Sequence, residues 1–226
     1  MQYYDFHTHQ RKRHPDDVAI LSVDIREMGD PFHSPTTGCS KKNELYAVGL
    51  HPWYIDANDR QSTNLLFAKV RQWASLTEVV AIGETGLDKK IIKSAGDALY
   101  QQEIFISHIR LSEEVQKPLI IHCVKTWNEI LQIRQSLQPS MPWIIHGFRG
   151  KAPLAKQLTD AGFYLSFGLR YNREALKTSW VRQRLFLETD DKDIDIRDVY
   201  RQVSNELNIT EQELSEAIEN RLSPFF

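Results

Sequence analysis

Short apolar segments alternate along the chain with segments of helical periodicity, and this alternation restricts the possible folds more than any other feature. The apolar segments are rich in β-branched residues and are bounded by polar or turn residues, which predicts strands. The eight predicted strands are Tyr3–His7, Val18–Ile25, Leu45–Leu50, Val79–Ile82, Leu119–Ile121, Trp143–Ile145, Phe163–Phe167 and Leu185–Leu187. Most are separated by helix-period segments, such as the one that places Leu66, Val70, Trp73 and Ala74 on one face.

This pattern predicts an α/β fold with a parallel sheet buried on both faces. Strands of that kind read as nearly continuous apolar runs, and their crossover connections are helices. About eight such repeats in one domain favour a closed TIM-like (β/α) barrel, and an open doubly wound sheet is the alternative. The chain has 226 residues, so we expect residues 1–226 to form a single domain.

The first repeat departs from the pattern. Only about ten residues, Thr8–Asp17, join the first two predicted strands, whereas a parallel crossover usually needs a dozen or more. We therefore expect the first helix to be missing or reduced, and Val18–Ile25 to pair irregularly or antiparallel. The result would be a distorted barrel closer to seven strands. We expect a loop over Arg26–Asn43, and a last helix that begins near Thr210 and Glu213 and runs towards Leu222.

Composition bears on the partners that the protein could attract and on its cellular compartment. The formal net charge is −2, so attraction to a polyanion would have to come from local charge placement. The two cysteines, Cys39 and Cys123, form no CxxC pair, which fits a reducing compartment, and the cytoplasm is expected. Neither a signal peptide nor a membrane span is expected, because no apolar run approaches the roughly 20 residues that a span needs.

Side chains that commonly bind metals stand at or just beyond the ends of several predicted strands. They are His7, His9, Glu84, His122, His146 and Asp190. In barrel enzymes the carboxyl ends of the strands form the catalytic face. Each residue alone has an ordinary explanation, because a histidine that ends a strand is often simply hydrogen-bonded. Their joint placement at strand ends predicts a metal centre instead.

The spacing suggests a role for each ligand. His7 and His9 are two residues apart in an extended segment, so both can point to the same side and bind one cation. Glu84 could bridge two cations, which lie about 3.5 to 4 Å apart in two-metal hydrolases. His122 and His146 would hold the second ion. Asp190 would bind the first ion and accept a proton from water, which makes Asp190 and Glu84 the candidate catalytic residues.

Six segments resemble successive motifs of the TatD family of metal-dependent deoxyribonucleases. They are Asp5-Phe-His-Thr-His9, Gly49-Leu-His-Pro52, Ile82-Gly-Glu-Thr-Gly-Leu-Asp88, Ile120-Ile-His-Cys123, Ile145-His-Gly-Phe-Arg-Gly150 and Leu187-Glu-Thr-Asp190. The resemblance spans nearly the whole chain. It implies metal at the six ligands above, with two divalent ions such as magnesium, manganese or zinc. It also implies hydrolysis of DNA phosphodiesters, often exonucleolytic, so single-stranded DNA or 3′ ends are the expected partners.

The chain also departs from the family pattern. Val124 and Lys125 follow Cys123, where the family commonly has an arginine, and Asp191-Lys192-Asp193 replaces a small residue and proline. These departures keep open a second hypothesis, an amidohydrolase-like enzyme that uses the same two-metal site on a small amide, lactone or ester. A non-catalytic binding protein is a third hypothesis. The complete ligand set argues against it.

Weaker signals concern the substrate. Cationic residues in loops at the predicted catalytic face, including Arg11, Arg13, Lys125 and Arg149, could bind phosphates or could be ordinary surface charges. His51 could contact the substrate, orient a ligand or simply pack, and Glu188 is expected to support the site.

Other aromatic and histidine residues give weaker indications. Trp53 and Tyr54 could stack a base or cap a core. His14, His33 and His108 lie away from strand ends and are expected to face solvent.

Overall fold

The structure is a computed structural model, which describes residues 1–10, 14, 16–29 and 44–223. Eight strands form one sheet with the strands in chain order, from β1 to β8. They are β1 (Tyr4–Thr8), β2 (Val18–Asp24), β3 (Glu44–Gly49), β4 (Val79–Asp88), β5 (Leu119–Val124), β6 (Trp143–Ile145), β7 (Phe163–Phe167) and β8 (Leu185–Leu187). Thr8 also forms a parallel bridge with Asp190, just after β8, so the sheet returns to its first strand. The expected barrel class of fold is confirmed.

Seven α-helices and one 3₁₀ helix lie among the described residues. They are η2 (Pro52–Tyr54), α1 (Arg60–Ala74), α2 (Ala95–Val115), α3 (Trp127–Leu137), α4 (Ala152–Asp160), α5 (Arg173–Val181), α6 (Ile196–Leu207) and α7 (Glu211–Leu222). Local sequence sets several of their starts. Ser94 and Asp97 form a capping box at α2, and Thr210 and Glu213 form another at α7, as expected.

The first two strands correct one expectation. β2 pairs with β1 in parallel, so the antiparallel alternative is wrong, and the sheet has eight strands instead of about seven. The expected irregularity is present, because the register shifts between Asp5 and Thr8. None of the described residues between β1 and β2 is helical, in agreement with the missing first helix. A connection of about ten residues joins these parallel strands, and the backbone N–H of Val18 donates to the carbonyl of Tyr3. The expected loop at Arg26–Asn43 falls mostly outside the described residues.

β4 is longer than the apolar run that predicts it, and its extension brings Glu84 and Asp88 into the strand. Gly83 and Gly86 interrupt the apolar pattern, and both have positive φ angles, which glycine adopts without strain. At Gly86 an added Cβ would lie 2.0 Å from the carbonyl oxygen of His122. β4 can approach β5 this closely beside His122 because position 86 has no side chain.

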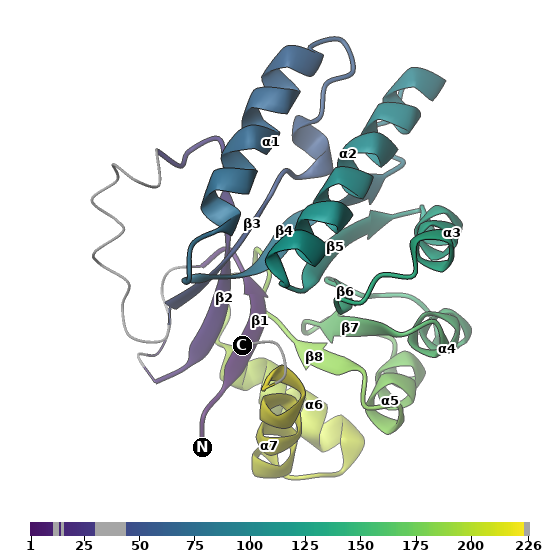
Figure 1. The fold of residues 1–226 in the computed structure, drawn as a ribbon. Coiled ribbons are helices and arrows are strands. Elements are labelled where there is room, and N and C mark those ends of the chain that lie inside the picture. The colour runs from purple at the N-terminus through teal and green to yellow at the C-terminus, as the bar shows by residue number, and fades with distance from the viewer. Residues whose placement is uncertain (11–13, 15, 30–43, 224–226) are drawn as a thin grey trace. The chain divides into compact units, whose positions relative to one another are not determined.

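The chain divides into two compact units. The first comprises residues 1–21, 41–45 and 144–226, and the second comprises residues 22–40 and 46–143. In the first, the rings of Phe6 and Phe186 stack at 4.4 Å between centroids. In the second, α1 and α2 both pack against β4 and lie side by side in Figure 1, and Phe105 meets Trp143 edge to face. Each unit therefore has an aromatic core of its own.

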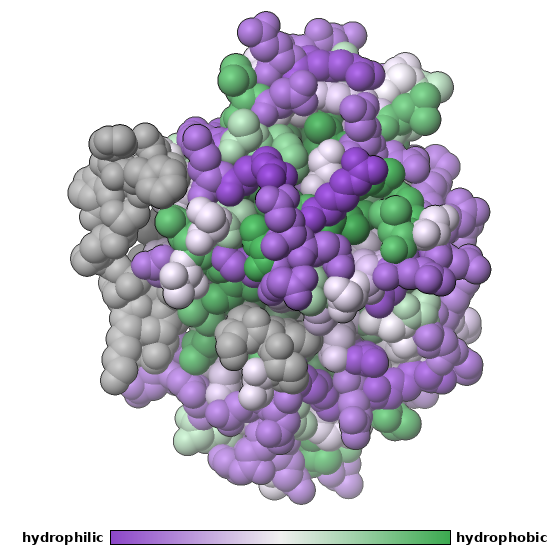
Figure 2. All heavy atoms as spheres, in the orientation of Figure 1, coloured by the Kyte–Doolittle hydropathy of each residue, from purple (hydrophilic) through white to green (hydrophobic). Residues whose placement is uncertain are grey.

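The surface is mainly polar. Figure 2 shows hydrophilic residues over most of one face, with hydrophobic side chains scattered between them. The large apolar residues that are exposed include Trp53, Leu65 and Val181. None of the described helices has the length and apolar character needed to cross a membrane.

Candidate metal centre

In the first unit, the pairing of β1 with the end of β8 brings His7, His9 and Asp190 together. The backbone N–H of Asp190 donates to the carbonyl of His7, and the N–H of His9 donates to the carbonyl of Asp190. Asp190 Oδ1 lies 3.6 Å from His7 Nε2 and 3.9 Å from His9 Nε2. His7 is buried, whereas His9 is exposed. Each residue offers a ligand atom within 4.8 Å of the others, so the set can hold one cation, as the His-x-His spacing predicts.

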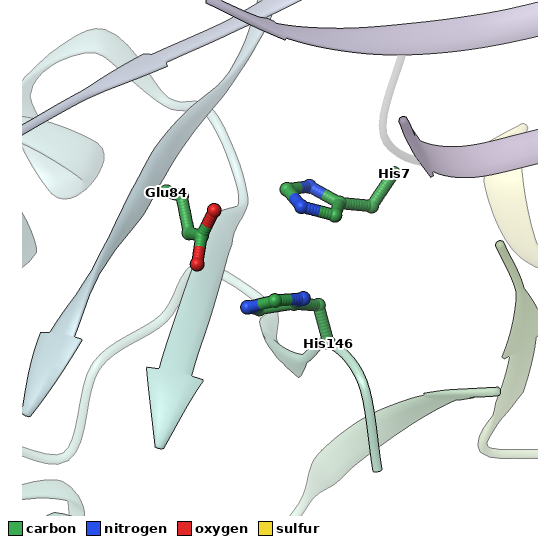
Figure 3. A group of neighbouring side chains, drawn as sticks. All are labelled: His7, Glu84 and His146. Carbon is green, nitrogen blue, oxygen red and sulfur yellow. The ribbon is translucent and has the colours of Figure 1, made fainter. Parts of the chain in front are cut away.

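His146 follows β6 and joins the same unit. Its ring centroid lies 4.3 Å from that of His7, and Figure 3 shows the two imidazoles facing each other, with Glu84 of β4 drawn in the same view. His146, Glu188 and Asp190 also offer ligand atoms within 4.8 Å of one another. The residues after β6 and β8 therefore form an overlapping donor group, and Glu188 lies directly beside the predicted ligands.

Glu188 is a buried carboxyl group, with a residue exposure of 1%. Its Oε1 accepts a hydrogen bond of 2.6 Å from the backbone N–H of Gly147, while Oε2 has no hydrogen bond of regular geometry among the described residues. Burial raises the pKa of Glu188 to about 7, and the nearby His146 acts in the opposite direction. A carboxylate in this position needs a compensating positive charge, which fits a cation at this donor group.

A buried hydrogen-bond cluster lies next to the donor set of His7, His9 and Asp190. Thr189 donates to both oxygens of Asp5, at 3.0 Å from its backbone N–H and 2.6 Å from its hydroxyl. The same hydroxyl lies 2.8 Å from that of Thr8. Thr8 and Thr189 each lie next to a predicted ligand, so this cluster ties the end of β1 to the end of β8. Asp5 had no role predicted from the sequence. Its place two residues before His7 in the same strand was the signal that could have identified it.

The second unit holds a donor set made of His51, Glu84 and His122. Glu84 Oε1 lies 2.9 Å from His122 Nδ1 and 3.1 Å from His51 Nε2, and the two nitrogens are 3.2 Å apart. These atoms can surround one cation. His51 precedes η2, and its Nδ1 accepts from the backbone N–H of Trp53, so its Nε2 is the nitrogen that faces the set. It was expected to bind substrate, orient a ligand or pack, and the structure places it among the candidate ligands.

Asp88 supports this second set and was not assigned a role from the sequence. Its Oδ2 lies 3.2 Å from His122 Nε2 and accepts a 2.9 Å hydrogen bond from the indole N–H of Trp53. Burial raises the pKa of the Asp88 carboxyl, but hydrogen bonds from Trp53, the Lys90 backbone and His122 outweigh this effect and leave the pKa lowered. A carboxylate on the far nitrogen of a metal-binding histidine fixes the tautomer and the ring orientation.

A hollow of about 210 Å³ opens beside Asp190 in the first unit. Glu188 and Asp190 line it together with three cationic residues, Arg149, Arg170 and Lys192. All three cations are exposed. Arg149, an expected substrate contact, is one of the residues that line this hollow. Arg170 is another of the loop cations predicted at the catalytic face, whereas Lys192 was not predicted there.

The remaining expected substrate contacts are Arg11, Arg13 and Lys125. Arg11 and Arg13 fall outside the described residues. Lys125 is exposed at the end of β5, with a φ of 58°.

His108 corrects a further expectation, because it is fully buried instead of facing solvent. Its Nε2 accepts from the backbone N–H of Leu50, and its Nδ1 lies 2.8 Å from the carbonyl of Ile104. The helical spacing from Gln101, Phe105 and Ile109 was the signal that places it on the inner face of α2.

Residues 34–226 match the family model described as TatD related DNase. The chain belongs to the TatD-related DNase family. This result confirms the resemblance seen in the motifs. It also agrees with the positions of the donor residues, because Glu84, His122, His146 and Asp190 lie in the matched segment and only His7 and His9 precede it.

Two curated relatives and one solved structure illustrate the relationship. An uncharacterized metal-dependent hydrolase of Bacillus subtilis is 34% identical over 152 residues, which cover 64% of this TatD-related chain and 57% of the relative. Another from Haemophilus influenzae is 27% identical over 221 residues, covering 87% and 83%. The chain spans about half the length of the first curated relatives that it matches, 45% and 57%. The crystal structure of a TatD homologue from Escherichia coli matches with a TM-score of 0.77 at 16% identity, covering 99% and 97% of the two chains, and supports the fold.

Proposed function

We propose that this TatD-related protein is a metal-dependent hydrolase that cleaves DNA phosphodiester bonds. The observation that carries the proposal is the hollow in the first unit, where Arg149, Arg170 and Lys192 line the same space as Asp190. Cationic side chains beside a candidate proton acceptor suit an anionic substrate, and guanidinium groups match phosphate oxygens in geometry. The description of the family as DNases supports the same substrate class.

The two donor sets fit divalent cations by their chemistry. Each combines imidazole nitrogen with carboxylate oxygen, which suits zinc or manganese, and magnesium when water completes its shell. We infer one cation at His7, His9 and Asp190, and another at His51, Glu84 and His122. Bound there, divalent cations would polarise phosphoryl oxygens and make water more acidic.

The protein side chains divide the remaining work. Arg149, Arg170 and Lys192 bind and orient the phosphate, which lowers the entropy cost of reaching the reactive geometry. Asp190 accepts the proton of the attacking water as the new phosphorus–oxygen bond forms and the bond to the leaving oxygen breaks. Asp88 holds the His122 ring in place through the far nitrogen.

The decisive experiment measures bound metal and cleavage of a labelled single-stranded oligodeoxynucleotide. We expect about two equivalents of divalent metal, cleavage that stops with a chelator, and loss of at least about a thousandfold in rate for Asp190→Asn. Asp198→Asn, an exposed aspartate on α6, is the matched control and should keep the native rate.

The cationic hollow has its own test. Arg149→Ala combined with Arg170→Ala should raise KM for DNA and reduce the salt dependence of binding, since each lost phosphate contact lowers the salt slope by about one. Bound metal with intact DNA and rapid hydrolysis of a small ester, lactone or amide would overturn the DNA assignment and favour the small-substrate alternative.

A further inference from the structure

Trp53 stands out among the exposed apolar residues because its ring is exposed while its indole N–H is held. The residue is 61% exposed, yet its Nε1–H donates to Asp88 Oδ2 at 2.9 Å. Holding a ring by its one polar group leaves the apolar surface available and reduces the entropy lost when a ligand stacks on it. Solvent exposure of an indole this large is otherwise unfavourable.

The position of Trp53 adds to this observation. Its ring meets the ring of His51 edge to face at 4.8 Å between centroids, and lies 6.3 Å from that of His122. Trp53 therefore borders the donor set of the second unit without belonging to it. A flat group attached to a phosphate at that set would come within reach of the indole.

We propose that Trp53 is a stacking platform for an unpaired nucleobase whose phosphate lies at the donor set of the second unit, and so gives the enzyme a preference for single-stranded over paired DNA. The inference rests on the proposed function and adds a substrate contact to it. Every base presents a π face, so stacking tolerates different sequences but requires a base that has left the duplex stack.

A merely structural role for Trp53 makes different predictions. In that case Trp53 would serve only to hold Asp88, and through it His122. Trp53→Phe removes the N–H that Asp88 accepts but keeps a flat ring, whereas Trp53→Ala removes both. The two variants therefore separate stacking from support of Asp88.

The test uses the full chain and two oligonucleotides, oligo(dT) and the same backbone with abasic residues at every position. Binding is followed by fluorescence anisotropy with metal chelated, and KM and kcat are measured with manganese. Trp53→Ala should weaken oligo(dT) binding and raise its KM about 10-fold, with kcat little changed. Trp53→Phe should lose about threefold or less, and neither variant should alter binding of the abasic strand. Leu65→Ala, which removes another exposed apolar side chain of the second unit, should bind oligo(dT) as the native protein does.

The outcomes separate the two proposals. If the native protein cleaves neither oligonucleotide, the proposed function fails. In a second outcome the native protein cleaves both strands. If Trp53→Ala and Trp53→Phe then weaken binding of oligo(dT) and of the abasic strand equally, the stacking role fails while the nuclease assignment stands. Equal rates of cleavage by the native protein on oligo(dT) and on the same strand paired with a complementary strand would also overturn the role of Trp53.

Discussion

At the scale of single residues, Asp88 shows how a side chain outside the predicted ligands can orient one of them. It gives His122 a fixed partner on the nitrogen that faces away from Glu84, so the nitrogen towards Glu84 is the one offered to a cation. Sequence position identified His122 and Glu84 as candidate ligands because each stands near the end of an apolar run. It could not identify Asp88 as the partner of His122, because that pairing depends on how far β4 extends beside β5.

Asp88→Asn should weaken metal binding by about 10- to 100-fold, because a neutral amide orients and polarises the His122 ring less well. Isothermal titration with manganese measures the effect. Trp53→Phe removes the other side-chain donor to the same carboxylate and should bind manganese almost as tightly as the native protein. Equal losses in the two variants would contradict a direct role of Asp88 on His122.

His108 predicts a pH dependence of stability. Burial lowers the pKa of His108 to about 4, below the usual value of 6.5. The unfolded chain therefore binds a proton between these values that the folded chain excludes. The stability that depends on neutral His108 is fully present above pH 6.5 and is lost as the pH falls towards 4, and the loss amounts to about 2 kcal/mol at pH 5.

Urea unfolding at several pH values measures this contribution. His108→Gln should be less stable at pH 7, because it disturbs the contacts to Leu50 and Ile104, but its free energy of unfolding should fall less between pH 7 and 5. The same slope in both proteins would show that His108 does not control the effect.

At the scale of elements, β4 shows which features of the fold a sequence can predict. Its apolar start was predicted, but its continuation past Ile82 was not, because two glycines interrupt the pattern that identifies strands. The same limit explains β2, whose parallel pairing could not be read from a connection of unusual length. Helix starts were easier to predict where a capping box is local in sequence, as at Thr210 and Glu213.

Gly86→Ala should damage the β4–β5 pairing. The new Cβ would meet the carbonyl oxygen of His122 at 2.0 Å, at a φ of 147° that side chains rarely adopt. We expect a loss of at least about 2 kcal/mol in unfolding free energy, together with weaker metal binding. Gly96→Ala in α2 is the matched control, since its Cβ would lie no closer than 3.5 Å to Ser94 Oγ, and it should be neutral or stabilising. Equal stability in both variants would contradict the close approach.

For the whole molecule, metal binding should be coupled to folding stability. A cation that binds the folded chain and not the unfolded one stabilises it by about 2.7 kcal/mol at a hundred times its Kd. We expect manganese to raise the Tm and a chelator to lower it. The combination of Glu84→Gln and Asp190→Asn, which alters one carboxylate in each donor set, should remove most of this response. A native Tm that does not change with manganese would argue against both metal sites.

The two donor sets differ in how soon they can form as the protein is made. His51, Glu84 and His122 lie within 72 residues of chain, whereas Asp190 follows His7 by 183 residues. At about 5 to 20 residues per second, the ribosome adds those 183 residues in roughly 10 to 40 s. During that interval β1 has no β8 to pair with, so the set of His7, His9 and Asp190 can form only after β8 has been made.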